Sequence, residues 1–380
     1  MRARTQLFEL TSARFFAALV VLLGHFNEFL GMPEWLATAI AGGFGVSFFF
    51  VLSGFILTYR YWDDFAGGIA RGELRRYLVA RVARVYPPYA LALLAITALY
   101  LAADRRYPGL VAFPPDPVLS WLANLLALQT FAPTYATQQV WNGPAWSIST
   151  ELGFYLALPP LLYLIARHCA SMRRLVMLLA ATVAYGAAMQ AAALVAMIDW
   201  GWDGTLWVAL VASRNVFWRL PEFVAGVVAA RLLHGGHLPW LARAGARNAL
   251  LAASLALVLV LNYAPWPAGH LPHVIERQFR VNLGYMLPFA GIVLALGAGP
   301  TLVSPVLRRP FWVFLGDISY GVYIYHWIPW TVLAWALNGG WILPNSLVAG
   351  VMLDTILFAA ASYIWFERPT RLHLRRRLGQ

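Results

Sequence analysis

The sequence is poor in charge. Only 12% of its 380 residues are charged, about half the proportion of an average soluble domain. Acidic residues are the scarcest, with 16 Asp and Glu against 28 basic side chains, all of them arginine because lysine is absent. So few charges cannot cover a water-facing surface of this size, which excludes an ordinary soluble globular protein.

Other absences narrow the chemistry. Cys169 is the one cysteine, which excludes an intramolecular disulfide, and its place in a short basic connector favours an incidental thiol. The sequence has no Cys/His spacing suited to zinc, no glycine-rich nucleotide motif and no Gly-x-Ser-x-Gly elbow. We therefore expect no metal cofactor. No small-residue cleavage site follows the first apolar run, so we interpret that run as a membrane span rather than a signal peptide.

Apolar residues are abundant instead. They make up 61% of the chain and fall in long blocks, many close to the ~20 residues that cross a bilayer. The pattern predicts an all-α, polytopic transmembrane helical bundle of about ten spans, forming a single domain over residues 1–380. The expected spans are 12–30, 42–61, 85–103, 149–166, 174–197, 215–233, 248–263, 282–298, 313–337 and 343–365.

The arginines test this span count. If the N-terminus is cytoplasmic, 21 of the 28 arginines fall on the inner side, 5 on the outer side and two within spans. Such a bias at every alternate connection is what the positive-inside rule requires. It predicts that both termini are cytoplasmic and that the protein is a multi-pass protein of the inner (plasma) membrane. Because these charges lie between apolar blocks, we expect lipid rather than nucleic acid as their partner.

Two connectors are long enough to carry structure. The outer connector 104–148 contains six prolines and an apolar piece, 121–128, that is too short to cross. We expect this piece to be re-entrant or interfacial. In the inner connector 60–84, the stretch 73–84 has the pattern of a basic amphipathic helix leading into the third span.

The first span contains two polar residues, Arg14 and His25. Eleven residues are about three helical turns, so the two side chains share one face ~16 Å apart. One interpretation is a cationic anchor at a cavity mouth with a general base deeper inside. The other is an arginine that reaches the headgroups and a histidine hydrogen-bonded to a neighbouring helix. On this span alone the two have equal weight.

Small and charged residues in other spans have plainer explanations. The glycines between Gly43 and Gly54 favour close helix packing, with Ser47 or Ser53 as possible cavity donors. Arg219 and Glu222, three residues apart, are expected to neutralise each other as a structural pair.

Three further patterns place polar groups on one helical face. Arg81 and Arg84 are three residues apart and suit phosphate groups, although ordinary positive-inside charge explains them equally well in isolation. Ser147 and Glu151 are four residues apart at the entry of the fourth span. Along the ninth span a polar stripe should face a cavity or a partner helix rather than lipid. Its members are Ser319, Tyr323 and His326.

Five of these patterns together resemble membrane acyltransferase family 3, the bacterial O-acyltransferases that modify surface polysaccharides. In the family's order they are the Arg14-to-His25 spacing, Gly43-Phe-Gly-Val-Ser-Phe-Phe-Phe-Val-Leu-Ser-Gly-Phe55, Arg81-x-x-Arg84-x-x-Pro87, Trp146-Ser-x-x-x-Glu151 and Ser319-Tyr-x-x-Tyr-x-x-His326. Each pattern alone is weak, whereas five in order, from about residue 8 to residue 369, are specific.

The resemblance implies an acyltransferase with ten spans and an acyl-CoA donor, usually acetyl-CoA, taken from the cytoplasm. Its acceptor would be a hydroxyl of a surface polysaccharide, a lipid-linked saccharide or a similar molecule. By motif position, His25 matches the essential histidine, Arg14 its partner, and Arg81 and Arg84 a basic pair on the donor side. Many relatives carry an extracytoplasmic esterase-like domain after the spans. This sequence ends eleven residues after Pro369, so no such domain is expected.

We expect direct transfer. The three arginines would hold the phosphates of CoA, His25 would deprotonate the acceptor hydroxyl, and Glu151 would orient the imidazole. Donors to the oxyanion would come from Ser147, Tyr323 or His326. A covalent acyl-histidine intermediate remains an open variant.

The main alternative function is a transporter or flippase of a lipid-linked saccharide. It also needs ten spans and a charged cavity, but it has no need of a cytoplasmic arginine pair combined with a titratable histidine. A non-catalytic scaffold does not account for five polar motifs within spans. The sequence does not determine the acceptor, the acyl chain length or the oligomeric state.

Overall fold

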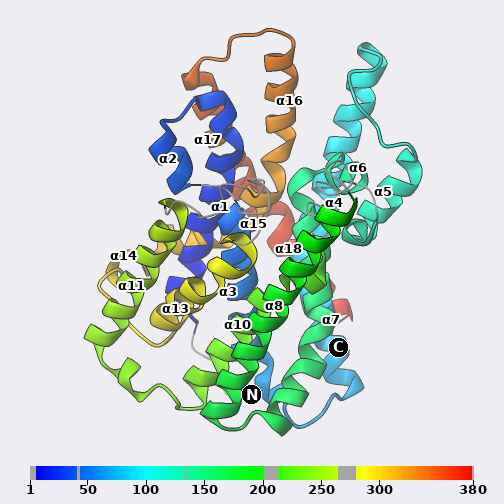
Figure 1. Cartoon of the computed structure of the whole chain (residues 1–380). Coiled ribbons are helices and arrows are strands. Elements are labelled where there is room, and N and C mark those ends of the chain that lie inside the picture. Colours follow the sequence, from blue (N-terminus) through cyan, green and yellow to red (C-terminus); the bar gives the residue numbers. More distant parts are fainter. Residues whose placement is uncertain (1–5, 41–42, 133–134, 201–212, 264–279, 379–380) are drawn as a thin grey trace.

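The computed structural model describes residues 6–40, 43–132, 135–200, 213–263 and 280–378, and these ranges are helical and contain no β-strand. Figure 1 shows long helices that run side by side along the molecule and are joined near its two ends. The predicted all-α polytopic bundle is therefore confirmed.

Most long helices coincide with predicted spans, although some extend beyond the predicted ends and others stop short of them. They are α1 (Phe8–Leu30), α3 (Gly43–Phe65), α4 (Arg71–Arg106), α7 (Trp146–His168), α8 (Met172–Trp200), α10 (Val216–His234), α11 (Ala244–Tyr263), α13 (Met286–Gly297), α15 (Pro310–Tyr325), α16 (Trp327–Asn338) and α17 (Asn345–Ser362). The shorter elements are α2 (Glu34–Ala39), α5 (Pro117–Leu125), η1 (Gln129–Phe131), α6 (Tyr135–Gln139), η2 (Gly143–Ala145), η3 (Pro239–Ala242), η4 (Arg280–Gly284), α14 (Ser304–Leu307), η5 (Tyr363–Glu367) and α18 (Arg368–Leu378).

Eight helical stretches of the described chain are long and apolar enough to cross a membrane. The other two predicted spans differ for local reasons. Helix α10 carries three charged side chains, Arg219, Glu222 and Arg231, and most of its residues are buried inside the bundle. The predicted span 313–337 is not one helix, because it is interrupted at His326, where α15 ends and α16 follows. A helix buried in a bundle need not be apolar all round, so both can cross without meeting the composition of a lipid-facing span.

Helix α4 joins two predicted elements. It runs without a break for 36 residues, from Arg71 through Pro87 and Pro88 to Arg106. The amphipathic stretch 73–84 and the third span are thus one helix. In consequence Arg81 and Arg84 belong to the transmembrane bundle rather than to a connector.

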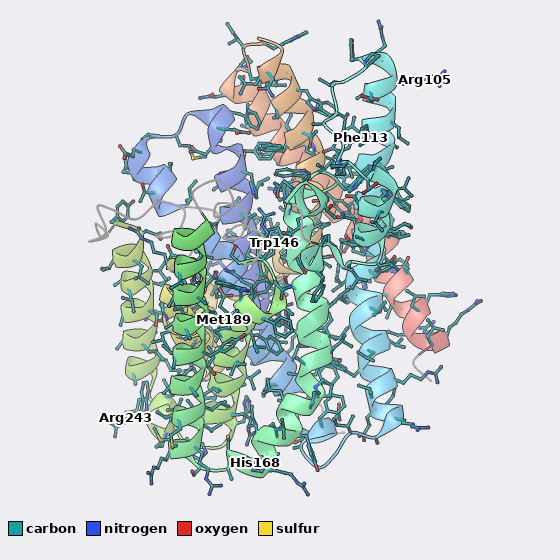
Figure 2. The ribbon with its side chains drawn as sticks, turned by 45° about the vertical axis from the view of Figure 1, so that its right-hand side comes forward. Arg105, Phe113, Trp146, His168, Met189 and Arg243 are labelled. Atoms are coloured by element: carbon teal, nitrogen blue, oxygen red, sulfur yellow. The ribbon has the colours of Figure 1, made fainter. Side chains whose placement is uncertain are left out.

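The two ends of the bundle carry different connections. In Figure 2, His168 and Arg243 lie at one end, whereas Arg105 and Phe113 lie toward the other. This matches the separation of inner and outer connections deduced from the arginine bias. The cytoplasmic location of the His168 end stays a prediction. Trp146, the first residue of α7, lies between the two ends, so the residues that follow it are inside the bundle.

Glycines set the closest helix contacts. A Cβ added to Gly54 of α3 would overlap the carbonyl oxygen of Phe223 in α10, and one added to Gly226 would overlap that of Val51. A Cβ on Gly316 of α15 would overlap the carbonyl oxygen of Thr11 in α1. The packing role predicted for the glycines of the second span is therefore confirmed.

Burial distinguishes central from peripheral helices. Of the most apolar part of each span, 62% is buried for the stretch Glu34–Phe65 that contains α3, but only 17% for Met172–Ala192 of α8, so α3 is central and α8 lies at the edge of the bundle. The apolar piece of the outer connector forms part of α5, a helix of nine residues, which is too short to cross, as predicted. Its Val118, Leu119 and Leu122 are exposed.

Candidate functional site

A cavity of about 110 Å³ lies among α1, α3, α4, α7 and α15. Each of these helices carries one of the five sequence patterns, and each contributes polar side chains to the wall. Of the predicted site residues, those that line the cavity are Arg14, Arg81, Arg84, Ser147 and Glu151, together with Ser319 and Tyr323 of the ninth-span stripe. The structure thus brings together residues that are more than 300 positions apart.

Four arginines line this cavity, and the part of the chain that the structure describes gives three of them no hydrogen bond or ion pair. These three are Arg14, Arg60 and Arg84. The fourth, Arg81, is buried and donates from Nη2 to the Tyr61 hydroxyl over 3.1 Å, while its Nε has no partner. Guanidinium groups within a membrane protein that lack a bonded counter-ion are costly. The arrangement is that of a site for an anion with several charges.

Among the residues that line the cavity, one carboxylate, Glu151, faces these cations. Its Oε1 accepts hydrogen bonds from the Ser53 hydroxyl at 3.2 Å and the Tyr155 hydroxyl at 2.6 Å. Both donors also line the cavity. Ser53 is one of the two serines predicted as cavity donors. The other, Ser47, lies elsewhere and donates to the carbonyl oxygen of Val281 at 2.9 Å.

A pair of hydroxyls forms another part of the cavity wall. The oxygens of Ser147 and Tyr323 are 2.7 Å apart, and they lie 3.1 and 2.8 Å from the carbonyl oxygen of Pro144. The predicted stripe on α15 therefore does face a cavity. Its last member, His326, does not line this cavity, although it lies only three residues beyond Tyr323 and their rings are 6.1 Å apart.

His25 and His326 form a second, adjacent group. Nδ1 of His25 lies 3.0 Å from Nε2 of His326, whose own Nδ1 lies 3.3 Å from the carbonyl oxygen of Val322. A carbonyl oxygen only accepts, so in a neutral His326 the hydrogen is on Nδ1 and Nε2 accepts from Nδ1–H of His25. Nε2 of His25 then carries a lone pair, which is the form that a general base needs.

The predicted site is therefore divided into an arginine-lined cavity and a histidine pair, and Tyr323 lines the cavity while its ring lies 6.1 Å from that of His326. The contact with His25 that the sequence suggested for Glu151 is made by His326. Glu151 is hydrogen-bonded to Ser53 and Tyr155 within the cavity.

The predicted pair of Arg219 and Glu222 is confirmed as a buried ion pair, with Nε and Oε2 2.9 Å apart. Arg219 also donates to Ser47 at 3.1 Å and to Asn282, and its guanidinium lies 5.1 Å from the ring centroid of Phe50. Phe50 lines the cavity. The ion pair thus fixes a wall of the cavity without lining it.

Two important residues were not identified from the sequence, Arg60 and Tyr61. In the sequence, Arg60 stands out only as one of the arginines on the inner side of the membrane. Its spacing of seven residues from Ser53 would have placed it on the cavity face of the same helix.

Among the described residues, no cluster of His, Cys, Asp and Glu has the arrangement of a metal site.

Comparison with known proteins agrees with this arrangement. A family model described as an acyltransferase domain, that of acyltransferase family 3, matches residues 7–366. The acyltransferase MdmB of Streptomyces mycarofaciens is 26% identical over 336 residues, covering 84% of this chain and 78% of the relative. Nodulation protein 10 of Rhizobium leguminosarum bv. viciae is 25% identical over 382 residues, covering 94% and 91%.

A third relative is the exopolysaccharide production protein ExoZ of Rhizobium meliloti (strain 1021). It is 28% identical over 330 residues, covering 86% of this chain and 89% of the relative. No solved structure matches the chain. Since the family match extends over nearly the whole bundle, the chain belongs to membrane acyltransferase family 3 and is an enzyme that transfers acyl groups other than amino-acyl groups.

Proposed function

We propose that the protein moves a short acyl group, acetyl in the first instance, from acyl-CoA to a hydroxyl of a glycan or glycan-bearing acceptor. The donor enters the bundle from the cytoplasmic side of the inner membrane. The observation that carries this proposal is the set of arginines around one cavity, three of which make no hydrogen bond or ion pair in the described chain. CoA carries a pyrophosphate and a further phosphate, the kind of polyanion that such a cavity binds.

The cavity also suits the rest of the donor. Between its arginines and the Ser147–Tyr323 pair, the wall is largely apolar, with Phe49, Ile56 and Leu57 of α3 among its residues. An uncharged pantetheine arm can pass along such a wall, with the phosphates held at the arginines. The thioester then lies toward the hydroxyl pair and the histidines beyond it.

The reaction requires one proton transfer in each direction. Nε2 of His25 takes the proton of the acceptor hydroxyl as its oxygen attacks the thioester carbon, and the carbonyl oxygen becomes an oxyanion. The oxyanion accepts from the Ser147 or Tyr323 hydroxyl, which turns its single hydrogen from the carbonyl oxygen of Pro144 toward the substrate. When the carbon–sulfur bond breaks, the CoA thiolate leaves and recovers the proton from His25.

In this proposal His326 is a positioning residue. By accepting from Nδ1–H of His25, it holds the imidazole with its lone pair on Nε2. Arg14, Arg81 and Arg84 bind the donor. Glu151 keeps the hydroxyl-rich wall in place through Ser53 and Tyr155 and limits the excess positive charge.

The name of one relative, an exopolysaccharide production protein, supports a glycan-type acceptor. The acyltransferase MdmB leaves other hydroxyl compounds open as acceptors. Only the hydroxyl is required by the chemistry, so the acceptor has to be identified by assay.

The test is CoA release by the purified protein given acetyl-CoA and candidate acceptors, compared with His25→Ala. We expect acceptor-dependent CoA release and its loss in the variant, with acetyl-CoA binding retained because His25 does not line the cavity. Unchanged turnover in His25→Ala would remove His25 from the chemistry. Movement of a saccharide lipid across vesicles without CoA release would favour the flippase instead.

A further inference from the structure

The cavity has an exposed cationic mouth on α3. The helix lines the cavity from Val46 to Arg60, and Arg60 is both the last of these residues and the exposed one among the four arginines. Seven residues separate it from Ser53, which bonds Glu151, so Arg60 lies ~10 Å further along the helix. The cavity therefore has a deep part at Glu151 and a solvent-facing part at Arg60.

At this mouth two guanidinium groups share one aromatic ring. Cζ of Arg60 lies 5.7 Å from the ring centroid of Tyr61, and Cζ of Arg81 lies 5.4 Å from the same centroid. The ring is itself fixed, since Tyr61 is buried and packs edge-on against Tyr77 at 4.8 Å. Two cations that contact the same ring repel each other, and an anion bound between them offsets this repulsion.

Both cations have donors available for such an anion. Arg60 makes no hydrogen bond or ion pair within the described ranges, and Nε of the buried Arg81 is also unused. A phosphate monoester carries close to two negative charges and several acceptor oxygens, so it can pair with both guanidiniums at once.

We propose that Arg60 and Arg81, held together by Tyr61, bind the ribose 3′-phosphate of CoA and select CoA thioesters over thioesters that lack this phosphate. This inference rests on the proposed acyl-CoA donor. It is based on the order in which the chemical groups of acyl-CoA must lie along the cavity. The thioester must reach the Ser147–Tyr323 end, and the ribose 3′-phosphate is separated from the thioester by the pyrophosphate. The pyrophosphate therefore lies deeper, near Arg14 and Arg84, and the 3′-phosphate lies at the mouth.

The experiment compares acetyl-CoA with acetyl-3′-dephospho-CoA in the wild-type protein, Arg60→Ala and Arg60→Lys. Arg71→Ala is the matched control, because Arg71 is an exposed arginine that does not line the cavity. We expect Arg60→Ala to raise KM for acetyl-CoA about tenfold, the effect of losing one charge-assisted hydrogen bond, with kcat unchanged. Its KM for the dephospho donor should equal that of the wild type, and Arg60→Lys should recover part of the difference.

Equal effects of Arg60→Ala on both donors, or no preference for acetyl-CoA in the wild type, would overturn this inference while leaving the acyl-CoA donor intact. Absence of turnover with either donor, together with absence of acetyl-CoA binding, would overturn the proposed function itself. A lipid headgroup is the other source of a phosphate at this depth. The measurements are therefore made in neutral-lipid nanodiscs and repeated with anionic lipid, and an Arg60 effect seen only with anionic lipid would assign the mouth to headgroups.

Discussion

The facing ring nitrogens of His25 and His326 lie 3.0 Å apart, although the two residues are 301 positions apart in the sequence. His25 lies on α1, and His326 lies where α15 gives way to α16. His326 is completely buried, and its ring stacks on that of His25 with the centroids 5.0 Å apart, while Trp327 packs edge-on against His25 at 5.5 Å. The pair therefore couples the first and ninth predicted spans at the point where we place the chemistry.

Replacing His326 should affect turnover rather than donor binding. In His326→Ala the imidazole of His25 loses the group that orients it, so we expect kcat to fall at least tenfold, within the range of general-base effects. KM for acetyl-CoA should stay unchanged, because neither histidine lines the cavity. His326→Gln can still accept a hydrogen bond and should recover part of kcat.

The control for this measurement is His168→Ala, a change of an exposed histidine at the end of α7. It should leave both constants unchanged. An increase of KM in His326→Ala with kcat intact would contradict the positioning role.

Removing the Arg84 guanidinium should weaken the donor complex. We expect Arg84→Ala to raise KM for acetyl-CoA about tenfold or more, since a hydrogen bond to a charged group contributes about 1.5–3 kcal/mol. Steady-state kinetics with acetyl-CoA as the varied substrate measures the change. Arg173→Ala, at the exposed start of α8, provides the comparison. An unchanged KM would exclude Arg84 from the donor site.

The hydroxyl of Tyr323 should contribute to the transition state. Tyr323→Phe keeps the ring but removes the hydroxyl that lies 2.7 Å from Ser147. If this hydroxyl stabilises the oxyanion, kcat falls about 10²-fold, as for the loss of one such donor. Tyr325→Phe is a matched control, because that hydroxyl is buried against Ser362 and outside the cavity. Equal rates in the two variants would remove Tyr323 from the reaction.

The buried ion pair should show strong coupling in stability. Removing one partner, as in Glu222→Gln, leaves the other charge in the bundle core and should destabilise the protein by about 3–5 kcal/mol. Replacing both, as in Arg219→Met with Glu222→Leu, should cost less than either single change. Thermal unfolding in detergent measures all three variants. Additive losses would show that the two residues do not act as a pair.

The α3–α10 contact should be intolerant of even one methyl group. Gly226→Ala forces a Cβ into the backbone of Val51, so we expect a loss of about 1–3 kcal/mol or failure to form a stable bundle. Gly350→Ala, at an exposed position with no atom near the added Cβ, should be neutral. Size-exclusion behaviour and thermal unfolding distinguish the two variants, and equal stability would contradict the proposed packing.

Local pattern was sufficient for much of the fold. Apolar block length and the arginine bias predicted the helical bundle and which connections share an end of it, because hydrocarbon requires long apolar helices wherever a chain crosses. The same reasoning failed where helices are shielded from lipid. The interruption at His326 and the continuation of α4 through Pro87 and Pro88 depend on packing against neighbours, which leaves no clear local signal.

The candidate site shows the same division. The sequence alone determined the types of residue and the helical faces on which they lie. These are Arg14 and His25 on one helix, Arg81 and Arg84 on another, and the stripe that ends at His326. Only the tertiary structure decided how these faces meet, since a side chain's partner on another helix depends on how the helices cross and rotate. It placed His326 rather than Glu151 against His25, added Arg60 and Tyr61 to the cavity mouth, and divided one expected site into a cationic cavity and an adjacent histidine pair.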